Sequence, residues 1–192
     1  MFKKAVKIGA QNQLSGKDRK TIKTKLSGLF KGECVEAVLN KYDKITCNKA
    51  SGGSKMLIYT ADGMPLFVDG TGKGDFFPSL YIAGSYQPIL PAILLNQGVE
   101  AYIFNGANLM WPGVAAFPTE FAKDQVVSIV NSEGEFVAVG AMGCSKAQLD
   151  SNPDKNGIAV YILHYRGDKL WEMGPKAAPE VVMSIQAEKK EA

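Results

Sequence analysis

The spacing of apolar positions predicts two helices near the amino-terminus and mostly strands after them. Between Ile22 and Phe30, apolar residues recur at helical spacing, which predicts an amphipathic helix that docks on one face and carries lysines on the other. Ser15 is the expected N-cap of this helix, and Gly32 is expected to end it. A second, shorter helix is expected to close near Lys41.

Alternating and β-branched segments separated by turn residues predict hairpins in both halves of the chain. Asp62-Gly63 joins two such segments, and this dipeptide is a strong signal for a two-residue hairpin turn. A second hairpin is expected over residues 126–142, followed by a strand over residues 158–165. Five or six short strands at regular spacing in the second half predict a small closed barrel, because closure removes exposed strand edges.

Residues 99–114 interrupt this pattern with two glycine-containing corners, in the run V-E-A-Y-I-F-N-G-A-N-L-M-W-P-G-V. Alternation over the first six residues predicts a strand, which Asn105-Gly106 breaks because this dipeptide tolerates positive φ. Residues 107–110 fit a single helical turn, which Pro112-Gly113 stops. Because both glycines lack side chains, we expect another backbone to approach closely there. A loop with the turn residues it requires is the alternative.

The length of 192 residues allows one domain or two small ones. The run Pro88-Ile89-Leu90-Pro91 is expected to form a rigid connector, because each proline fixes the backbone. We therefore expect an amino-terminal domain over residues 1–91 and a second domain over residues 92–174. Residues 175–192 show no clear packing pattern and are expected to be poorly ordered at their end.

The formal net charge of +3 conceals a strong asymmetry along the chain. Residues 1–32 contain nine lysines and arginines and one acidic residue, Asp18, which gives +8 for this segment and −5 for the remainder. Such a basic segment favours a polyanionic partner. The alternative is that these lysines only solvate the outer face of a helix.

The residues that usually carry chemistry are sparse. The three cysteines are widely spaced and no C-x-x-C pair occurs, which favours reduced thiols in the cytoplasm and argues against a zinc site. A histidine-based catalytic arrangement must use His164, the single histidine, and its place within an apparent strand favours a structural role. The run Gly70 to Gly74 lacks the spacing of a phosphate-binding loop and is predicted to be a flexible turn.

From this scarcity we expect no cofactor, no metal and no enzymatic activity. No apolar run is long enough to cross a membrane, and no signal-peptide core follows the first residues. A cytoplasmic location is therefore expected.

The second half resembles a PUA domain, a small RNA-binding pseudobarrel found in RNA-modifying enzymes and translation factors. The resemblance rests on F-N-G-A-N-L-M at residues 104–110, Pro112-Gly113, D-Q-V at residues 124–126 and the strand over residues 137–142. The whole layout is closer still to the malignant T-cell-amplified sequence proteins, over residues 1–173. The further matching runs are M-F-K-K at the start, F-P-S-L at residues 77–80, P-I-L-P at residues 88–91, I-L-H-Y at residues 162–165 and Leu170-Trp171.

This resemblance implies an α+β fold, in which a small α/β pre-PUA domain precedes a carboxy-terminal PUA β-pseudobarrel. It implies a noncatalytic RNA-binding translation factor that acts on the small ribosomal subunit with a density-regulated partner carrying a SUI1-type domain. The implied roles are reinitiation and the release of deacylated tRNA during recycling. Lys123-Asp124 departs from the Gly-Asp of many PUA domains, and the loop Ala50 to Ser54 and the tail after Gly174 are specific to this chain.

The RNA surface is expected at the glycine-containing corner, where bare backbone would admit unpaired nucleotides and lysines would hold phosphates. The residues expected there are Gly106, Ala107, Asn108, Trp111, Gly113, Lys123 and Lys146. Trp111 would either stack on a base or cap the barrel. A separate contact with ribosomal RNA is expected from Lys3, Lys4, Lys20 and Lys23.

Two other classes of function compete with RNA recognition. The first is a protein-interaction adaptor without direct RNA contact, which would dock partners on an apolar patch. The candidates for that patch are Phe76, Phe77, Tyr81 and Tyr86, whose alternative role is packing between domains. The second is a subunit of an RNA-modification enzyme, which the absence of a nucleotide or methyl-donor signature before the barrel disfavours.

Overall fold

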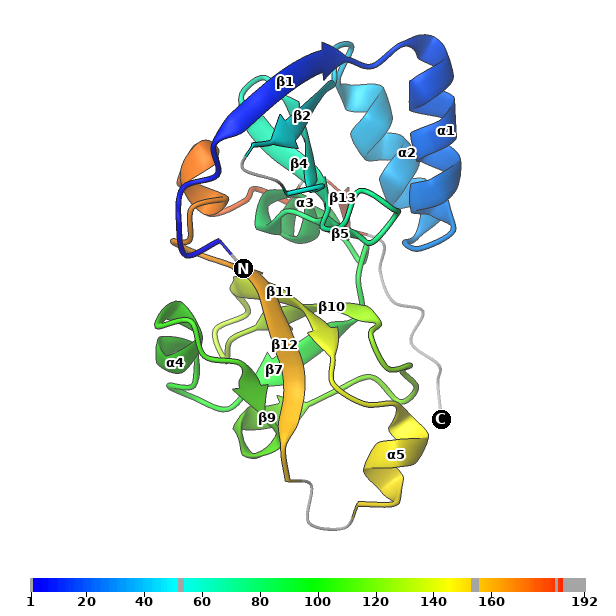
Figure 1. Cartoon of the computed structure of the whole chain (residues 1–192). Helices are drawn as coiled ribbons and strands as arrows, with labels where there is room; N and C mark the ends of the chain where they lie inside the picture. Colours follow the sequence, from blue (N-terminus) through cyan, green and yellow to red (C-terminus); the bar gives the residue numbers. More distant parts are fainter. Residues whose placement is uncertain (1, 52–53, 153–155, 182, 185–192) are drawn as a thin grey trace.

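The computed structural model describes residues 2–51, 54–152, 156–181 and 183–184, which form two lobes (Figure 1). The first lobe contains a five-stranded sheet in the order β1-β2-β3-β4-β5, accompanied by three helices. Its elements are β1 (Ile8–Gln13), α1 (Gly16–Ser27), α2 (Gly32–Lys41), β2 (Thr46–Ala50), β3 (Leu57–Ala61), β4 (Met64–Asp69), β5 (Phe76–Pro78), α3 (Leu80–Ser85) and β6 (Tyr86–Gln87). All four pairings within this sheet are antiparallel.

Local signals determine the start of α1 and the turn between β3 and β4. The Ser15 hydroxyl accepts from the Asp18 N–H while the Asp18 carboxylate accepts from the Ser15 N–H, a reciprocal capping box. Asp62 and Gly63 both have positive φ, 50° and 77°, as a tight hairpin turn requires. The end of α1 was predicted wrongly, because the helix stops at Ser27 and Gly32 begins α2 instead.

The second lobe contains a six-stranded mixed sheet that curls into a near-barrel, in the order β8-β12-β11-β10-β7-β9. Its elements are β7 (Ala92–Leu95), α4 (Glu100–Phe104), β8 (Leu109–Met110), η1 (Trp111–Gly113), β9 (Val114–Ala116), β10 (Val126–Val130), β11 (Phe136–Met142), α5 (Lys146–Asp150) and β12 (Ile158–Tyr165). The short helix η2 (Trp171–Met173) follows β12 but lies beside the first lobe, where Trp171 joins the core. The strands β10 and β7 pair in parallel, and the other pairs of this sheet are antiparallel. The predicted α+β fold with a carboxy-terminal pseudobarrel is confirmed.

The run 99–114 has nearly the reverse of its predicted secondary structure. A helix, α4, forms where alternation predicts a strand, and the strand β8 forms within the predicted helical turn. The pairing of Leu109 with Val160 on β12 explains the second difference, since a ladder with a neighbouring strand overrides the preference of four residues. The positive φ of Gly106, 82°, agrees with the prediction.

The segment after Gly174 packs against the first lobe, although the sequence shows no pattern for it. The Lys176 N–H donates to the Tyr81 hydroxyl at 3.0 Å, and the strand β13 (Met183–Ser184) pairs in parallel with β6. Residues 185–192, for which poor order is predicted, lie outside the described residues, as do residues 52–53 of the loop Ala50 to Ser54. Among the described residues, no helix has the length and apolar character needed to cross a membrane.

Candidate nucleic-acid interface

The glycine-containing corner begins with a regular helix end. Gly106 follows α4 in the left-handed region and donates its N–H to the Ile103 carbonyl at 2.8 Å. The next N–H, of Ala107, reaches the Tyr102 carbonyl at 3.0 Å. These two bonds form a Schellman cap, in which glycine is favoured because the left-handed conformation strains other residues. The backbone of the corner is therefore held in one conformation by its own hydrogen bonds.

Lys3 from the amino-terminal segment lies directly over this glycine. A Cβ atom built on Gly106 would be 2.5 Å from Lys3 Cε and 2.8 Å from Lys3 Nζ. The absence of a side chain at Gly106 thus makes room for a lysine from the other lobe. The structure therefore brings together the amino-terminal lysine and the glycine-containing corner, which the sequence analysis predicts as two separate RNA contacts.

Phe2 holds this lysine in place from the preceding position. Its side chain is 1% exposed, and its ring lies 6.3 Å from the ring of Phe77 and 6.2 Å from that of His164. Its carbonyl accepts the Lys169 N–H at 2.9 Å. The segment that carries Lys3 is therefore anchored where the two lobes meet.

The prediction that Gly113 opens the backbone to nucleic acid is wrong. A Cβ atom at Gly113 would be 2.9 Å from Val99 Cγ1 and 3.1 Å from Leu109 Cδ1. The protein's own side chains fill this space, so Gly113 allows close packing inside the lobe.

Trp111 caps the barrel and is not free to stack on a base. The side chain is 6% exposed and packs edge-to-face on Phe117, with ring centroids 5.5 Å apart. Phe121 lies 6.2 Å away on the same cluster. Of the two roles considered for Trp111, burial in the core is the one the structure shows.

The remaining polar residues of the corner are only partly available to a ligand. The Asn108 side-chain oxygen accepts the Ile162 N–H at 3.0 Å, which ties the start of β8 to β12 and leaves the amino group to donate. Lys123 is exposed, beside Asp124 in the left-handed region at φ 64°. Lys146 lies 2.6 Å from an Asp150 carboxylate oxygen within α5, so its charge is partly balanced.

Some of the basic side chains of helix α1 bind other parts of the protein, and others are exposed to solvent. Arg19 donates to three backbone carbonyls at the end of α2 and beyond, of Leu39, Tyr42 and Asp43. Lys23 forms an ion pair with Glu36 at 2.6 Å. Lys4 and Lys20 are exposed, so they remain the better candidates for a phosphate contact outside the corner.

Exposed aromatic residues occur on α4, which precedes the corner, and on β12, which pairs with β8, and the sequence interpretation missed them. Tyr102 is 69% exposed and Phe104 is 38% exposed on α4, and Tyr161 is 46% exposed on β12. We call these three the corner aromatics. A helical interpretation of residues 99–104 would have identified Tyr102, because Val99 and Ile103 would then share the inner face and leave it outside.

The four aromatic residues considered for partner docking are buried, which corrects that prediction. Phe76, Phe77, Tyr81 and Tyr86 are between 2% and 4% exposed. Tyr81 stacks on Trp171 with ring centroids 4.4 Å apart, and its hydroxyl donates to the Trp171 carbonyl at 2.7 Å. Trp171 comes after the last strand of the second lobe in sequence but packs in the same core as Tyr81, so this stack joins the chain that leaves the second lobe to the first lobe.

The glycine-rich run after β4 encloses the protein's own carboxylate. Asp69 is 3% exposed and accepts the N–H groups of Thr71, Gly72 and Gly74 at 3.3, 2.8 and 2.9 Å. Because these donors are already satisfied by Asp69, the run does not offer them to a bound phosphate.

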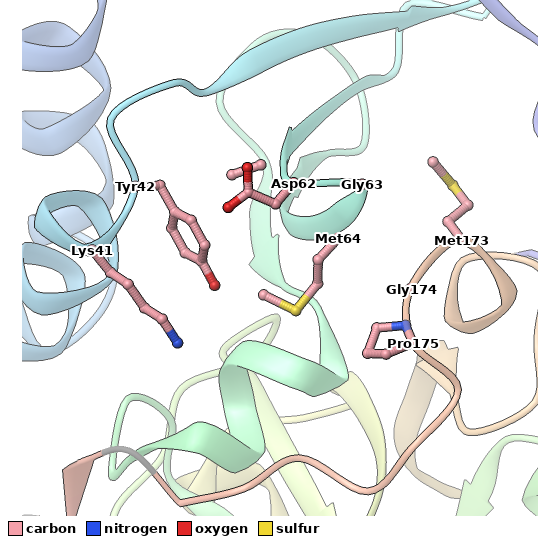
Figure 2. Close-up of a pocket in the computed structure, with 9 residues that line it drawn as sticks. Lys41, Tyr42, Asp62, Gly63, Met64, Met173, Gly174 and Pro175 are labelled. Atoms are coloured by element: carbon pink, nitrogen blue, oxygen red, sulfur yellow. The ribbon is translucent and has the colours of Figure 1, made fainter.

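A separate hollow of about 560 Å³ lies on the first lobe, away from the corner (Figure 2). Lys41 and Tyr42 at the end of α2 form one wall, the Met64 side chain extends toward them, and Met173 to Pro175 lie on the opposite side. Burial, together with the charge of Asp62, raises the pKa of Tyr42, so its hydroxyl stays protonated. Among the described residues, no group of three or more histidine, cysteine or acidic side chains could hold a metal ion.

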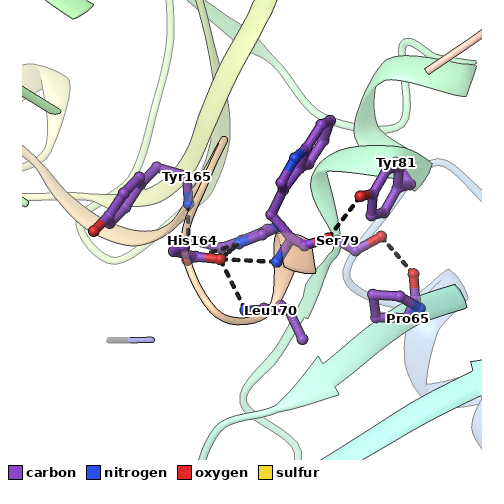
Figure 3. A network of polar contacts seen from close by, with 8 residues as sticks. Pro65, Ser79, Tyr81, His164, Tyr165 and Leu170 are labelled. Carbon is purple, nitrogen blue, oxygen red and sulfur yellow. Dashed lines mark hydrogen bonds and ion pairs between the residues drawn. The ribbon is translucent and has the colours of Figure 1, made fainter. Parts of the chain in front are cut away.

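His164 belongs to a buried network and not to an accessible catalytic group (Figure 3). Its Nδ1 lies 2.9 Å from the Asp168 carboxylate, and both side chains are fully buried. Asp168 also accepts the backbone N–H groups of Tyr165, Leu170 and Trp171. The nearby Ser79 hydroxyl donates to the Pro65 carbonyl at 2.7 Å and is itself buried. This serine, histidine and aspartate are therefore buried parts of the junction.

Two family models match the chain in succession, the Pre-PUA-like domain over residues 2–86 and the PUA domain over residues 91–165. Eukaryotic translation initiation factor 2D of Mus musculus is 27% identical over 198 residues, which cover 96% of this chain and 34% of that protein. Malignant T-cell-amplified sequence 2 of Mus musculus is 29% identical over 160 residues, which cover 80% of this chain and 86% of that protein. The chain thus spans about a third of the length of the initiation factor 2D relatives that it matches.

A solved structure shows the same arrangement of both lobes. It is a hypothetical protein of the hyperthermophilic archaeon Pyrococcus horikoshii OT3, with a TM-score of 0.68 and 25% sequence identity. The match covers 85% of this chain and 98% of that one. The two-lobed fold therefore occurs as a unit in a distant relative.

Proposed function

The chain belongs to the family of malignant T-cell-amplified sequence proteins, and on this premise we propose that it is a noncatalytic RNA-binding translation factor. The observation that carries the proposal is the position of Lys3 over Gly106, together with the exposure of the corner aromatics on α4 and β12. A surface that carries both a cation and exposed aromatic rings suits single-stranded RNA, which offers phosphates and unstacked bases together.

The corner would hold RNA through two kinds of contact. The Lys3 ammonium group would contact a phosphate, with Lys123 as a second, exposed candidate. Tyr102 and Tyr161 would stack on unpaired bases, a contact worth about 1–3 kcal/mol per base. The Asn108 amino group would donate to a base edge or a phosphate. Gly106 and Ala107 would contribute by having no bulky side chain, so that the RNA can approach the backbone of the corner.

The small ribosomal subunit is the proposed place of action. Two of the relatives have names that concern translation, Eukaryotic translation initiation factor 2D and Translation machinery-associated protein 20 of Schizosaccharomyces pombe. A ribosome-bound role would place the protein in the cytoplasm. We propose that it acts there with a density-regulated partner that carries a SUI1-type domain, in reinitiation and in the release of deacylated tRNA during recycling. The RNA at the corner would then be ribosomal RNA or the acceptor end of a tRNA.

Co-sedimentation with isolated small ribosomal subunits tests this proposal, with and without the SUI1-domain partner. We expect the chain to sediment with the subunits, and the double variant Tyr102→Ala, Tyr161→Ala to sediment less. Leu94→Ala is the matched control, because Leu94 is 38% exposed on β7, outside the corner. Binding in neither condition would favour an adaptor without RNA contact, and turnover of a modified nucleoside would favour an enzyme.

A further inference from the structure

A second hollow, of about 330 Å³, lies where the two lobes meet. The first lobe contributes Leu29, the loop before β5, and Phe76 and Phe77, and the second contributes Asp124, Val126, Ala141 and Leu163. We call it the inter-lobe cavity. Its volume is at the small end of ligand pockets, which hold about 300–1,000 Å³. It suits one or two side chains of a bound segment.

The walls of the inter-lobe cavity are largely apolar and one lip is an exposed leucine. Leu29 is 56% exposed, immediately after α1, although the sequence pattern assigns it to the docked face of that helix. Phe76, Phe77 and Leu163 contribute to the packed cluster beneath the opening. A bulky apolar side chain inserted here would bury both itself and Leu29.

The charged residues that line the cavity are both acidic. Asp75 is exposed, and its carboxylate accepts from the Thr71 hydroxyl. Asp124 is exposed, and its N–H donates to the Met142 carbonyl at 2.9 Å, which fixes the left-handed turn that carries it. The neighbouring Lys73 and Lys123 are exposed but are not part of the lining. Two carboxylates beside an apolar opening complement cationic groups next to an apolar one, and they repel phosphate.

We propose that the inter-lobe cavity docks a short segment of a partner protein, in which a bulky apolar side chain is flanked by lysine or arginine. The apolar side chain enters between Leu29 and Leu163, and the flanking cations pair with Asp75 and Asp124. The proposal goes beyond RNA recognition and does not rest on it, because the corner uses a lysine and aromatic rings from other residues. The cavity draws on both lobes, so a bound segment would also hold them in one relative position.

Synthetic peptides titrated into the full chain test this proposal, with amide chemical shifts as the readout. The probe is the blocked peptide Gly-Arg-Trp-Leu-Arg-Gly, compared with a version that carries glutamate for both arginines and one that carries serine for tryptophan and leucine. We expect the arginine peptide to shift the amides of Leu29, Phe77 and Leu163. We expect binding at least about tenfold weaker for the other two peptides, since each removes one of the two matching features.

Variants of the chain then locate the contact. Asp124→Asn keeps a residue that tolerates positive φ and removes the charge, so it should weaken the arginine peptide severalfold and leave the fold intact. Asp62→Asn is the matched control, because Asp62 also has positive φ and is exposed, but lies on the β3–β4 turn. Equal binding of the glutamate peptide, shifts confined to other residues, or no binding at millimolar peptide would overturn the proposal. Sedimentation with ribosomal subunits, measured on the same variants, keeps this outcome separate from that of RNA binding.

Discussion

Gly106 and Gly113 lie on the same corner, yet they have opposite surroundings. At Gly106 the space that a side chain would occupy is taken by a lysine from the other lobe, at the surface. At Gly113 it is taken by Val99 and Leu109, which belong to the packing of the barrel. A glycine in a sequence therefore indicates that something approaches closely, but not whether the neighbour is core, solvent or ligand.

The aromatic residues of the corner show the same division. Trp111 faces inward onto Phe117 and Phe121, whereas Tyr102 faces solvent. The inner half of the corner, Gly113 and Trp111, should accordingly determine the stability of the fold. The outer half, Lys3 and the corner aromatics, should determine RNA affinity.

Trp111→Ala should cause the largest loss of stability. Removal of a buried tryptophan loses its burial and leaves a cavity, so we expect the free energy of unfolding to fall by about 3–5 kcal/mol. Urea denaturation followed by circular dichroism measures this. Met110→Ala is the control, since Met110 is 46% exposed and a surface substitution usually stays within about 0.5 kcal/mol. If the Trp111→Ala variant were as stable as the unmodified chain and had lost only RNA affinity, Trp111 would be a binding residue and not a core residue.

Gly113→Ala should destabilise by about 1–3 kcal/mol, because the new methyl group overpacks against Val99. The double variant Gly113→Ala, Val99→Ala should recover part of this loss, since it removes the opposing methyl groups. Unfolding free energies of both variants measure the coupling. Additive losses would show that the two side chains do not compete for one space.

Tyr102→Ala and Tyr161→Ala should weaken binding of single-stranded RNA by about 1–3 kcal/mol each. Stability should change little, because both side chains are largely exposed. Fluorescence anisotropy with a labelled oligonucleotide measures the affinity, and thermal unfolding checks the fold. Unchanged affinity in both variants would remove the outer half of the corner from the RNA surface.

Lys3→Gln should have the smallest effect at one salt concentration and is best seen in the salt dependence. Loss of one phosphate contact should reduce the slope of log affinity against log salt by about one. The paired variant Lys20→Gln, Lys23→Gln is informative beside it, since Lys23 already pairs with Glu36. If its slope equals that of the unmodified chain, α1 does not contact RNA, and the same result for Lys3→Gln would exclude that lysine.

Much of the fold could be predicted because local chemistry specifies it. The Ser15 capping box, the Asp62-Gly63 turn and the strand over residues 158–165 each depend on a few neighbouring residues. Gly140, a glycine within the strand over residues 136–142, lies at a register shift and close to Val160, as a glycine inside a strand pattern indicates. Such features survive in the structure because tertiary contacts reinforce them.

The site was harder to predict because its features depend on distant contacts. Six residues from Val99 satisfy both a strand and a helical pattern, and only the rest of the lobe decides between them. Spacing alone could not place Trp111 inside or Lys3 over Gly106, since the latter contact joins residues more than a hundred positions apart. The sequence located the corner but not the direction in which its side chains point.

The turn after β4 is an anion-binding turn in which the bound anion, the Asp69 carboxylate, belongs to the same chain. Asp69 is supplied by the same chain as the amide donors around it, so its effective concentration there far exceeds that of a free phosphate. To bind here, a nucleotide phosphate would have to displace the Asp69 carboxylate, which is covalently part of the same chain. A phosphate in solution therefore competes for these amide groups at a large disadvantage.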